Sequence, residues 1–328
     1  MLVKWPEDNC TLSSKALFIM KKILFLATVL IFAECWATAQ AVKTNGYKNK
    51  LETINRQLAE AYKSKNLDGI TGIFDKDAVS MPEYQLSMKG VDAIKEYYRE
   101  LLSRRKTKDF TKKILELIVL KGNVAEIGTF TTTYTNGNNI QTTLDGKYFN
   151  IWSVKENGSL KLKAESYGYF KAIDTPSSHV VKVANQGAGR ITIQPTMLNK
   201  NLAFQLQALN ALMEKSVKNR DGNLRADFFT EDAVFMPYAD SLKKGMPAIR
   251  SHLIAYNSYP VTIDSISIYN VYVEDCSEFV IEYPMFYVEW HIPGHSGIGS
   301  GKGIRIWRRE ADCSLKLFRE IGVHDHLE

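Results

Sequence analysis

The chain lacks any apolar run that approaches the roughly 20 residues a membrane-spanning helix needs. Its longest such run extends only from Ile23 to Ala33. This excludes a membrane-embedded enzyme, and we expect no insertion of the protein into a membrane.

That short run lies in a segment with the pattern of a secretory signal. Met20 is followed by two lysines, the apolar run and the small residues Ala37-Thr38-Ala39. A basic start, a short apolar stretch and small residues before the cleavage point define such signals. We therefore predict a signal peptide over residues 20–39, cleaved near Ala39, and a periplasmic or secreted protein. Residues 1–19 carry no export pattern and are interpreted as a mis-called extension upstream of a true start at Met20.

Cysteine is scarce, with four in 328 residues. Cys10 and Cys35 would be removed with the signal, which leaves Cys276 and Cys313 in a compartment that permits disulfides. Both lie at predicted turns, so they can pair with each other or remain free. Their spacing provides no cysteine-based zinc site.

The chain also lacks a strong charge of one sign. Lys and Arg number 42 against 36 Asp and Glu, a net charge of +6. Residues 40–172 carry 22 basic and 15 acidic residues, whereas residues 191–328 carry 14 and 17. Opposite signs favour packing of the two halves on each other and argue against a nucleic-acid-binding face.

What the sequence does contain is a repeat with a constant offset of 155 residues. The segment DAVSMPEYQLSMKGVDAI at 77–94 matches DAVFMPYADSLKKGMPAI at 232–249 at nine of eighteen positions. At the same offset GKYFNIWSVKENGSLKLKAE, from 146, matches GKGIRIWRREADCSLKLFRE, from 301, at nine of twenty positions. Average amino-acid usage would give roughly one identity in twenty. The protein therefore contains two copies of one domain.

Each copy changes its hydrophobic period in the same order. Leu51, Ile54 and Leu58 recur at helical spacing, as do Leu206, Leu209 and Met213. A short second helix, a brief strand and a third helix introduced by glycine are expected to follow. Later residues are rich in Thr, Val, Ile, Tyr and Phe and are divided by Gly-containing turns, which is typical of strands. We predict an α+β fold with domains over 46–171 and 197–325. Residues 172–196 are predicted to form a linker with a small hairpin.

The two copies resemble SnoaL-like domains of the nuclear-transport-factor-two-like (ketosteroid isomerase-like) superfamily. The motifs FDKDAVSMPEYQLSMKGVDAI and FTEDAVFMPYADSLKKGMPAI carry the resemblance, together with the segments from 146 and 301. It implies two cone-shaped domains, each with three N-terminal helices packed in a strongly curved antiparallel sheet that encloses a mostly apolar cavity. It also implies dimerisation through the outer sheet face. We therefore expect the two domains to pair within the chain as a pseudo-dimer.

The resemblance does not extend to the catalytic residues of ketosteroid isomerases. Their general base falls at Met81 and Met236, and their hydrogen-bonding tyrosine falls near Leu58 and Met213. A thioether cannot accept a proton at neutral pH, so that mechanism is not expected. No strand–helix phosphate loop is found either, because GIGSGKG at 297–303 lies within sheet sequence and is interpreted as a flexible hairpin.

Two glutamates are the candidate catalytic residues. Glu165 and Glu320 occupy equivalent positions on the last predicted strand of each copy, where a carboxylate inside a cone could act as acid or base. The alternative, that each side chain is exposed or paired with a nearby base, is favoured because carboxylates on strands are mostly exposed. The histidines after residue 250, including His324, have no counterparts in the first copy, and we expect no metal site and no cofactor.

Three functions remain open from the sequence. The first is a binding protein for a small apolar molecule, with Met81, Tyr84, Trp152, Met236, Tyr238, Tyr287 and Trp307 as candidate ligand-binding residues. The second is a cofactor-independent acid–base enzyme of isomerase, cyclase or dehydratase type that uses a pocket glutamate. The third is an interaction scaffold with filled cones. A cavity of several hundred Å³ is usual for ligand sites, so cavity size separates the third function from the others.

Overall fold

The computed structural model describes residues 44–173, 181 and 200–325. The predicted signal peptide, the extension before it and most of the predicted linker lie outside the described residues. Within the described ranges no helix combines the length and the apolar character needed to cross a bilayer.

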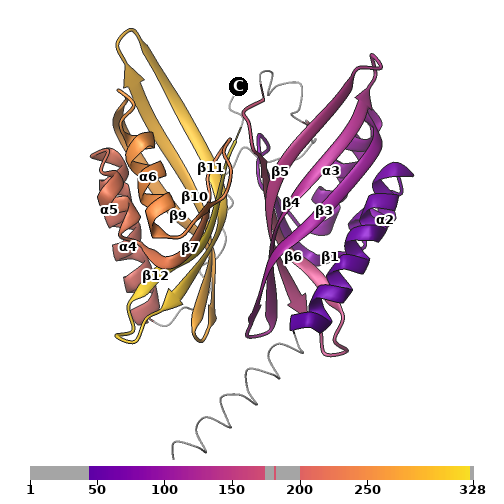
Figure 1. The fold of residues 1–328 in the computed structure, drawn as a ribbon, viewed down its shortest axis with the longest axis horizontal. Coiled ribbons are helices and arrows are strands. Elements are labelled where there is room, and N and C mark those ends of the chain that lie inside the picture. The colour runs from indigo at the N-terminus through magenta and orange to yellow at the C-terminus, as the bar shows by residue number, and fades with distance from the viewer. Residues whose placement is uncertain (1–43, 174–180, 182–199, 326–328) are drawn as a thin grey trace, which may run out of the picture. The chain divides into compact units, whose positions relative to one another are not determined.

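Each copy begins with helices at the expected places. The first copy has a helix over residues 44–63, then α2 (Leu67–Thr71) and, after a strand, α3 (Val91–Arg104). The second copy has α4 (Lys200–Lys218), α5 (Gly222–Ala226) and α6 (Met246–Asn257). Figure 1 shows these helices against one face of the sheet of their own copy.

The starts of these helices repeat between the copies. Asn66 caps α2 by accepting a hydrogen bond from the Gly69 amide, and Asp221, 155 residues later, caps α5 in the same way. Such side-chain caps satisfy amides that have no partner in the first helical turn. Gly90 and Gly245 precede α3 and α6 with φ angles of 85° and 77°, which only glycine adopts without strain.

The strands form one six-stranded sheet in each copy. The first sheet consists of β1 (Phe74–Pro82), β2 (Met88–Lys89), β3 (Arg105–Leu120), β4 (Asn123–Asn136), β5 (Gln141–Val154) and β6 (Leu160–Tyr169), in the order β2-β1-β6-β5-β4-β3. The second consists of β7 (Phe229–Met236), β8 (Lys243–Lys244), β9 (Thr262–Cys276), β10 (Phe279–Ile292), β11 (His295–Arg309) and β12 (Leu315–His324), in the equivalent order β8-β7-β12-β11-β10-β9. The predicted α+β class and the tandem arrangement are confirmed.

Two details of the sheets differ from the sequence prediction. β1 pairs in parallel with β6, and β7 with β12, so neither sheet is purely antiparallel. The reason is that α3 and α6 carry the chain across to the far edge, from which the later strands return by hairpins. The glycine-rich stretch 297–303 is not a flexible hairpin but part of β11, where Gly297 and Gly301 leave room for Trp290 and Phe286 of β10.

Register shifts bend the long strands. One lies between Ile151 and Trp152 of β5, and its counterpart lies between Ile306 and Trp307 of β11. Pro284 sits at a further shift in the pairing of β10 with β9, as expected from its missing amide proton. An extra residue in one strand increases its local bend and twist, and the sheets curve toward their helices (Figure 1).

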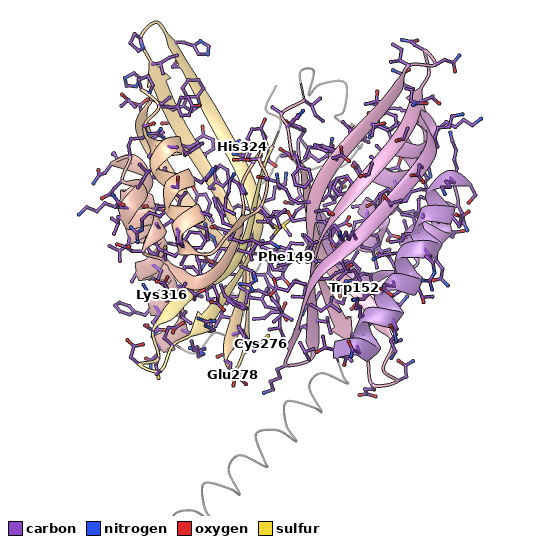
Figure 2. The ribbon with its side chains drawn as sticks, viewed as in Figure 1. Phe149, Trp152, Cys276, Glu278, Lys316 and His324 are labelled. Atoms are coloured by element: carbon purple, nitrogen blue, oxygen red, sulfur yellow. The ribbon has the colours of Figure 1, made fainter. Side chains whose placement is uncertain are left out.

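The two faces of the sheets contribute to different hydrophobic cores. In the second copy Leu206 and Leu253 of the helices pack with Trp307 of the sheet. A separate cluster joins residues of both copies, among them Phe149 and Ile304. On β5, Phe149 belongs to this joint cluster, whereas Trp152 beyond the register shift donates a hydrogen bond to Glu126, which also accepts one from Asn55 of the helix over 44–63. Figure 2 labels both side chains of β5.

Candidate functional site

A cavity of about 100 Å³ lies between the helices and the sheet of the first copy. On the helical side its wall is formed by Leu58 of the first helix, Ile70 of α2, and Tyr98 and Leu101 of α3. The sheet side supplies most of the polar atoms. Tyrosines dominate the lining: Tyr62, Tyr98, Tyr134, Tyr148, Tyr167 and Tyr169. An aromatic wall with polar tips suits a flat, mostly apolar molecule.

Glu165 of β6 faces this cavity and is only 8% exposed. Its Oε1 accepts hydrogen bonds from Ser80 Oγ at 2.6 Å and from the Tyr98 hydroxyl at 3.0 Å. In the part of the chain that the structure describes, no ion pair is formed by Glu165. Burial raises the pKa of Glu165, and the opposing effects of the two hydrogen bonds and of the Lys112 charge do not cancel it. The protonated form of Glu165 is therefore favoured relative to an ordinary, exposed glutamate.

Basic residues line the same cavity. The Lys112 ammonium lies 3.9 Å from the centre of the Tyr148 ring, and the Arg105 guanidinium lies 4.5 Å from that of Tyr134. Both contacts are cation–π interactions, which hold a charge over an aromatic face. The cavity thus combines one carboxyl group with two cations on its sheet side.

A second carboxylate beneath the cavity was missed by the sequence comparison. Glu126 of β4 is fully buried and accepts four hydrogen bonds. The donors are Tyr148 at 2.7 Å, Trp152 at 2.8 Å, and Asn55 and Asn150 at 3.2 Å each. A buried carboxylate with this many donors is a structural anchor, since its lone pairs are occupied.

The second copy contains the same anchor. Glu282 of β10 accepts from Trp307 at 2.7 Å and from Asn210 at 3.2 Å. The asparagines and tryptophans of the two copies are 155 residues apart, but the glutamates are 156 apart. A gap-free comparison at the constant offset therefore does not align them. The repeated Asn and Trp were the signal that could have found this anchor.

Glu320, the counterpart of Glu165, has different surroundings. It is 4% exposed and accepts hydrogen bonds from Arg225 Nη2 at 2.8 and 3.0 Å and from Arg305 Nε at 2.6 Å. Burial acts to raise the pKa of Glu320, but the two guanidinium groups hold it below its ordinary value. At the offset of 155, Arg225 and Arg305 correspond to Ile70 and Asn150. Only the second copy fills this position with ion pairs.

The other predicted ligand-binding residues do not line the first cavity. Met81 and Met236 belong to the cluster shared by both copies. Trp152 and Trp307 are fully buried and donate to the anchoring glutamates described above. Tyr287 is half-buried within β10, where it pairs with Ser300 and Ser267.

Tyr84 and Tyr238 come together although they lie in different copies. Their hydroxyl oxygens are 2.9 Å apart, and their rings meet edge to face. Close by in sequence, Glu83 is buried. Its Oε2 accepts from the Tyr169 amide at 2.6 Å, and burial raises the pKa of Glu83 to about 7 despite the nearby charges of Lys147 and Lys302.

The disulfide considered for Cys276 and Cys313 is not formed. Cys276 is buried at the end of β9, where its Sγ lies 3.9 Å from Asn123 Nδ2 of the first copy. Cys313 is exposed in the turn after β11. Burial raises the pKa of Cys276 to about 11, so its thiol stays protonated. Among the described residues no group of three or more His, Cys, Asp and Glu is placed to hold a metal ion.

Comparison with models of protein families finds no match. Comparison with curated proteins finds none either.

Solved structures are similar to stretches about the length of one copy. A ketosteroid isomerase-like protein from Erwinia carotovora atroseptica is 14% identical over 39% of this chain and 98% of its own, with a TM-score of 0.34. ActVI-ORFA from Streptomyces coelicolor is 16% identical over 39% of this chain and all of its own, with a TM-score of 0.34. A protein from Catenulispora acidiphila in complex with S-DNPA is 20% identical over 38% and 95%, with a TM-score of 0.35.

Proposed function

We propose that the first copy binds a small, largely apolar molecule in its cavity, with Glu165 as the group that orients it. The cavity volume of about 100 Å³ is below the several hundred Å³ usual for ligand sites, so the molecule must have few atoms or displace part of the cavity wall. The carrying observation is a buried carboxyl group that faces a tyrosine-lined cavity without a cationic partner in the described chain. A carboxyl group in such a place orients a ligand by hydrogen bonding, while the aromatic walls provide most of the contact area. A hydroxyl or carbonyl group on the ligand would pair with Glu165.

The second copy is proposed to support the first rather than to bind a ligand itself. Arg225 and Arg305 lie around Glu320, and the guanidinium group of each forms an ion pair with it. Arg305 also pairs with Glu282. In this proposal the second cone, which is filled by ion pairs, has the scaffold function, and the first cone has the binding function.

Native mass spectrometry of the protein purified from a bacterial periplasm tests the binding function. We expect one small molecule per chain, with reduced occupancy in Glu165→Gln and unchanged occupancy in the matched variant Glu320→Gln that still folds. If the measured mass equals that of the polypeptide alone, under conditions that preserve non-covalent complexes, the result would argue against the binding function. The same spectra test export, because cleavage near Ala39 removes a defined mass.

Proton transfer by Glu165 is a second candidate, favoured by its raised pKa. As a base it would remove a proton from a carbon beside a carbonyl group and return that proton, or another, to the same molecule. No cofactor is needed for this step. Deuterium from heavy water should then enter the co-purified molecule in the presence of the native protein but not of Glu165→Gln. Binding without deuterium incorporation would leave the protein a binding module.

The pairing of the two domains as a pseudo-dimer belongs to the same proposal. Glu116 and Arg319 form an ion pair between the copies, with Arg319 Nε 2.8 Å from Glu116 Oε2. Lys163 and Glu274 form another at 2.5 Å. We expect small-angle scattering of the mature protein to fit one rigid particle. A profile that requires two independently moving domains would contradict the pseudo-dimer.

A further inference from the structure

A second cavity, of about 330 Å³, lies where strands of the two copies meet. From the first copy, β1 and β6 contribute Val79, Met81 and Ala164. From the second, β9 and β10 contribute Val271 and Met285, with the aromatic rings of Tyr272 and Tyr283 beside them. This space is separate from the cone of the first copy, because the two cavities share no lining residue.

The repeat explains why the cavity exists on one side of the pseudo-dimer. Ala164 corresponds to Arg319 at the offset of 155, and Glu116 corresponds to Tyr272 at the offset of 156 that Glu126 and Glu282 show. Arg319 reaches across to Glu116, so charged side chains fill the equivalent space on the other side. In this cavity the methyl group of Ala164 and the uncharged ring of Tyr272 take the places of Arg319 and Glu116. Two substitutions thus open the cavity, and the rest of the interface closes around it.

The atoms that line a cavity of this size lack the contacts that a dense protein interior would provide, and a bound molecule can supply them. Pocket volumes of roughly 300 Å³ and above are those that hold small molecules in proteins. Val79, Met81, Ala164, Val271 and Met285 offer such a molecule an apolar surface. Two flexible methionines let the wall adapt to different shapes.

The polar residues at this cavity carry balanced charges. Lys163 is neutralised by Glu274, which also accepts a hydrogen bond from the Tyr283 hydroxyl at 3.0 Å. Asp77 and Lys89 add one charge of each sign. A hydroxyl group can accept from the ammonium and donate to the carboxylate, whereas a charged group would be repelled by one of them. The rim therefore favours a neutral polar end.

We propose that the cavity between the two copies is a second ligand site, which takes a neutral apolar molecule with one hydroxyl group, such as an aliphatic alcohol. Its apolar body contacts the two methionines, and its hydroxyl lies at Asp77 and Lys89. This site is distinct from the ligand site proposed in the first cone and does not depend on it.

Methionine methyl groups report on this site alone, because no methionine lines the cone of the first copy. We would label the methionine methyl groups with carbon-13 and titrate the full mature protein with 1-decanol, using decanoate as the charged analogue. The expected result is a saturable shift of the Met81 and Met285 signals, with at least tenfold weaker binding of decanoate. Unmoved Met81 and Met285 signals at saturating 1-decanol would overturn the proposal.

Two variants test the location. Ala164→Arg with Tyr272→Glu copies the filled side of the interface, and Ala164→Leu fills the space without adding charge. Both should abolish the shifts, while Ile70→Arg with Asn150→Arg, which fills the first cone, should leave them unchanged. Shifts that persist in folded Ala164→Leu, as judged by an unchanged far-ultraviolet circular dichroism spectrum, would place the alcohol elsewhere and contradict the proposal.

Discussion

Glu165 and Glu320 stand at equivalent positions of β6 and β12, yet only Glu320 is ion-paired. In the sheet of the first copy Glu165 pairs with Asn150 of β5, and in that of the second copy Glu320 pairs with Arg305, at the equivalent position of β11. A second substitution, Ile70 against Arg225, completes the difference. One carboxyl group is thereby left facing a cavity, and the other is held between two guanidinium groups.

The two glutamates should respond to pH with opposite sign. The pKa of Glu165 is raised in the folded protein, so its ionisation lowers the free energy of unfolding as pH rises above about 4.5, the ordinary value. The pKa of Glu320 is lowered, so its contribution to stability is present above that value and is lost as pH falls. Glu165→Gln should therefore stabilise the protein at pH 8 more than at pH 4. Glu320→Gln should destabilise it at pH 8 most.

Urea unfolding at the two pH values measures this difference. The matched positions make each variant the control for the other. Equal effects of pH on both variants would contradict the assigned environments.

Glu83 gives a further pH dependence. Its pKa is raised to about 7, so the native protein should lose stability as pH rises from 4.5 through 7. A shift of this size corresponds to about 3 kcal/mol at full ionisation. Glu83→Gln keeps an oxygen that accepts from the Tyr169 amide but cannot ionise. The free energy of unfolding of Glu83→Gln should therefore exceed that of the native protein at pH 8 and equal it at pH 4. The same difference between the two proteins at both pH values would be evidence against a buried, titrating Glu83.

Removing one partner from the ion pairs of the second cone should be costly. Arg305→Asn copies the residue of the first copy and leaves Glu320 with Arg225 alone, while Glu282 also loses a partner. Breaking a buried pair typically costs about 3–5 kcal/mol. As a control, Lys95→Ala removes an exposed pair with Asp68 and should leave the unfolding midpoint unchanged. Similar midpoints for the two variants in chemical denaturation would show that the cluster does not stabilise the second copy.

Replacing either anchoring glutamate, Glu126 or Glu282, by glutamine should destabilise the protein. In Glu126→Gln the new NH₂ group would face donors that now converge on the carboxylate. An unsatisfied buried polar group costs about 1–3 kcal/mol, and the loss of charge-assisted bonds adds to this. We expect a lower melting temperature for Glu126→Gln and for Glu282→Gln, measured by calorimetry. Glu156→Gln, in an exposed turn, is the control that should melt with the native protein.

Much of the fold could be predicted from local patterns, because the signals that set it are short-range. Gly90 and Gly245 mark helix starts, and Asn157-Gly158 marks a hairpin. The parallel pairing of β1 with β6 could not be predicted in this way, since it depends on where the chain returns after crossing the sheet.

The site was only partly predictable for a related reason. Glu165 was found because it repeats at a constant offset, but the same repeat concealed that Ile70 and Arg225 give the two glutamates different partners. Trp152 and Trp307 repeat as well, and their role is to bind Glu126 and Glu282, which lie one residue out of register. The sequence repeat identified the equivalent positions in the two copies. The burial of each side chain and the residues with which it pairs, which the repeat does not show, determine its chemistry.

The most direct test of the central claim exchanges the two cones. Ile70→Arg with Asn150→Arg gives the first cone the cations of the second, and Arg225→Ile with Arg305→Asn does the reverse. Each protein would be purified from the periplasm and analysed by native mass spectrometry. We predict that the small molecule retained through Glu165 is lost from the first double variant and kept by the second. Retention of that molecule by a folded Ile70→Arg, Asn150→Arg protein would contradict the account.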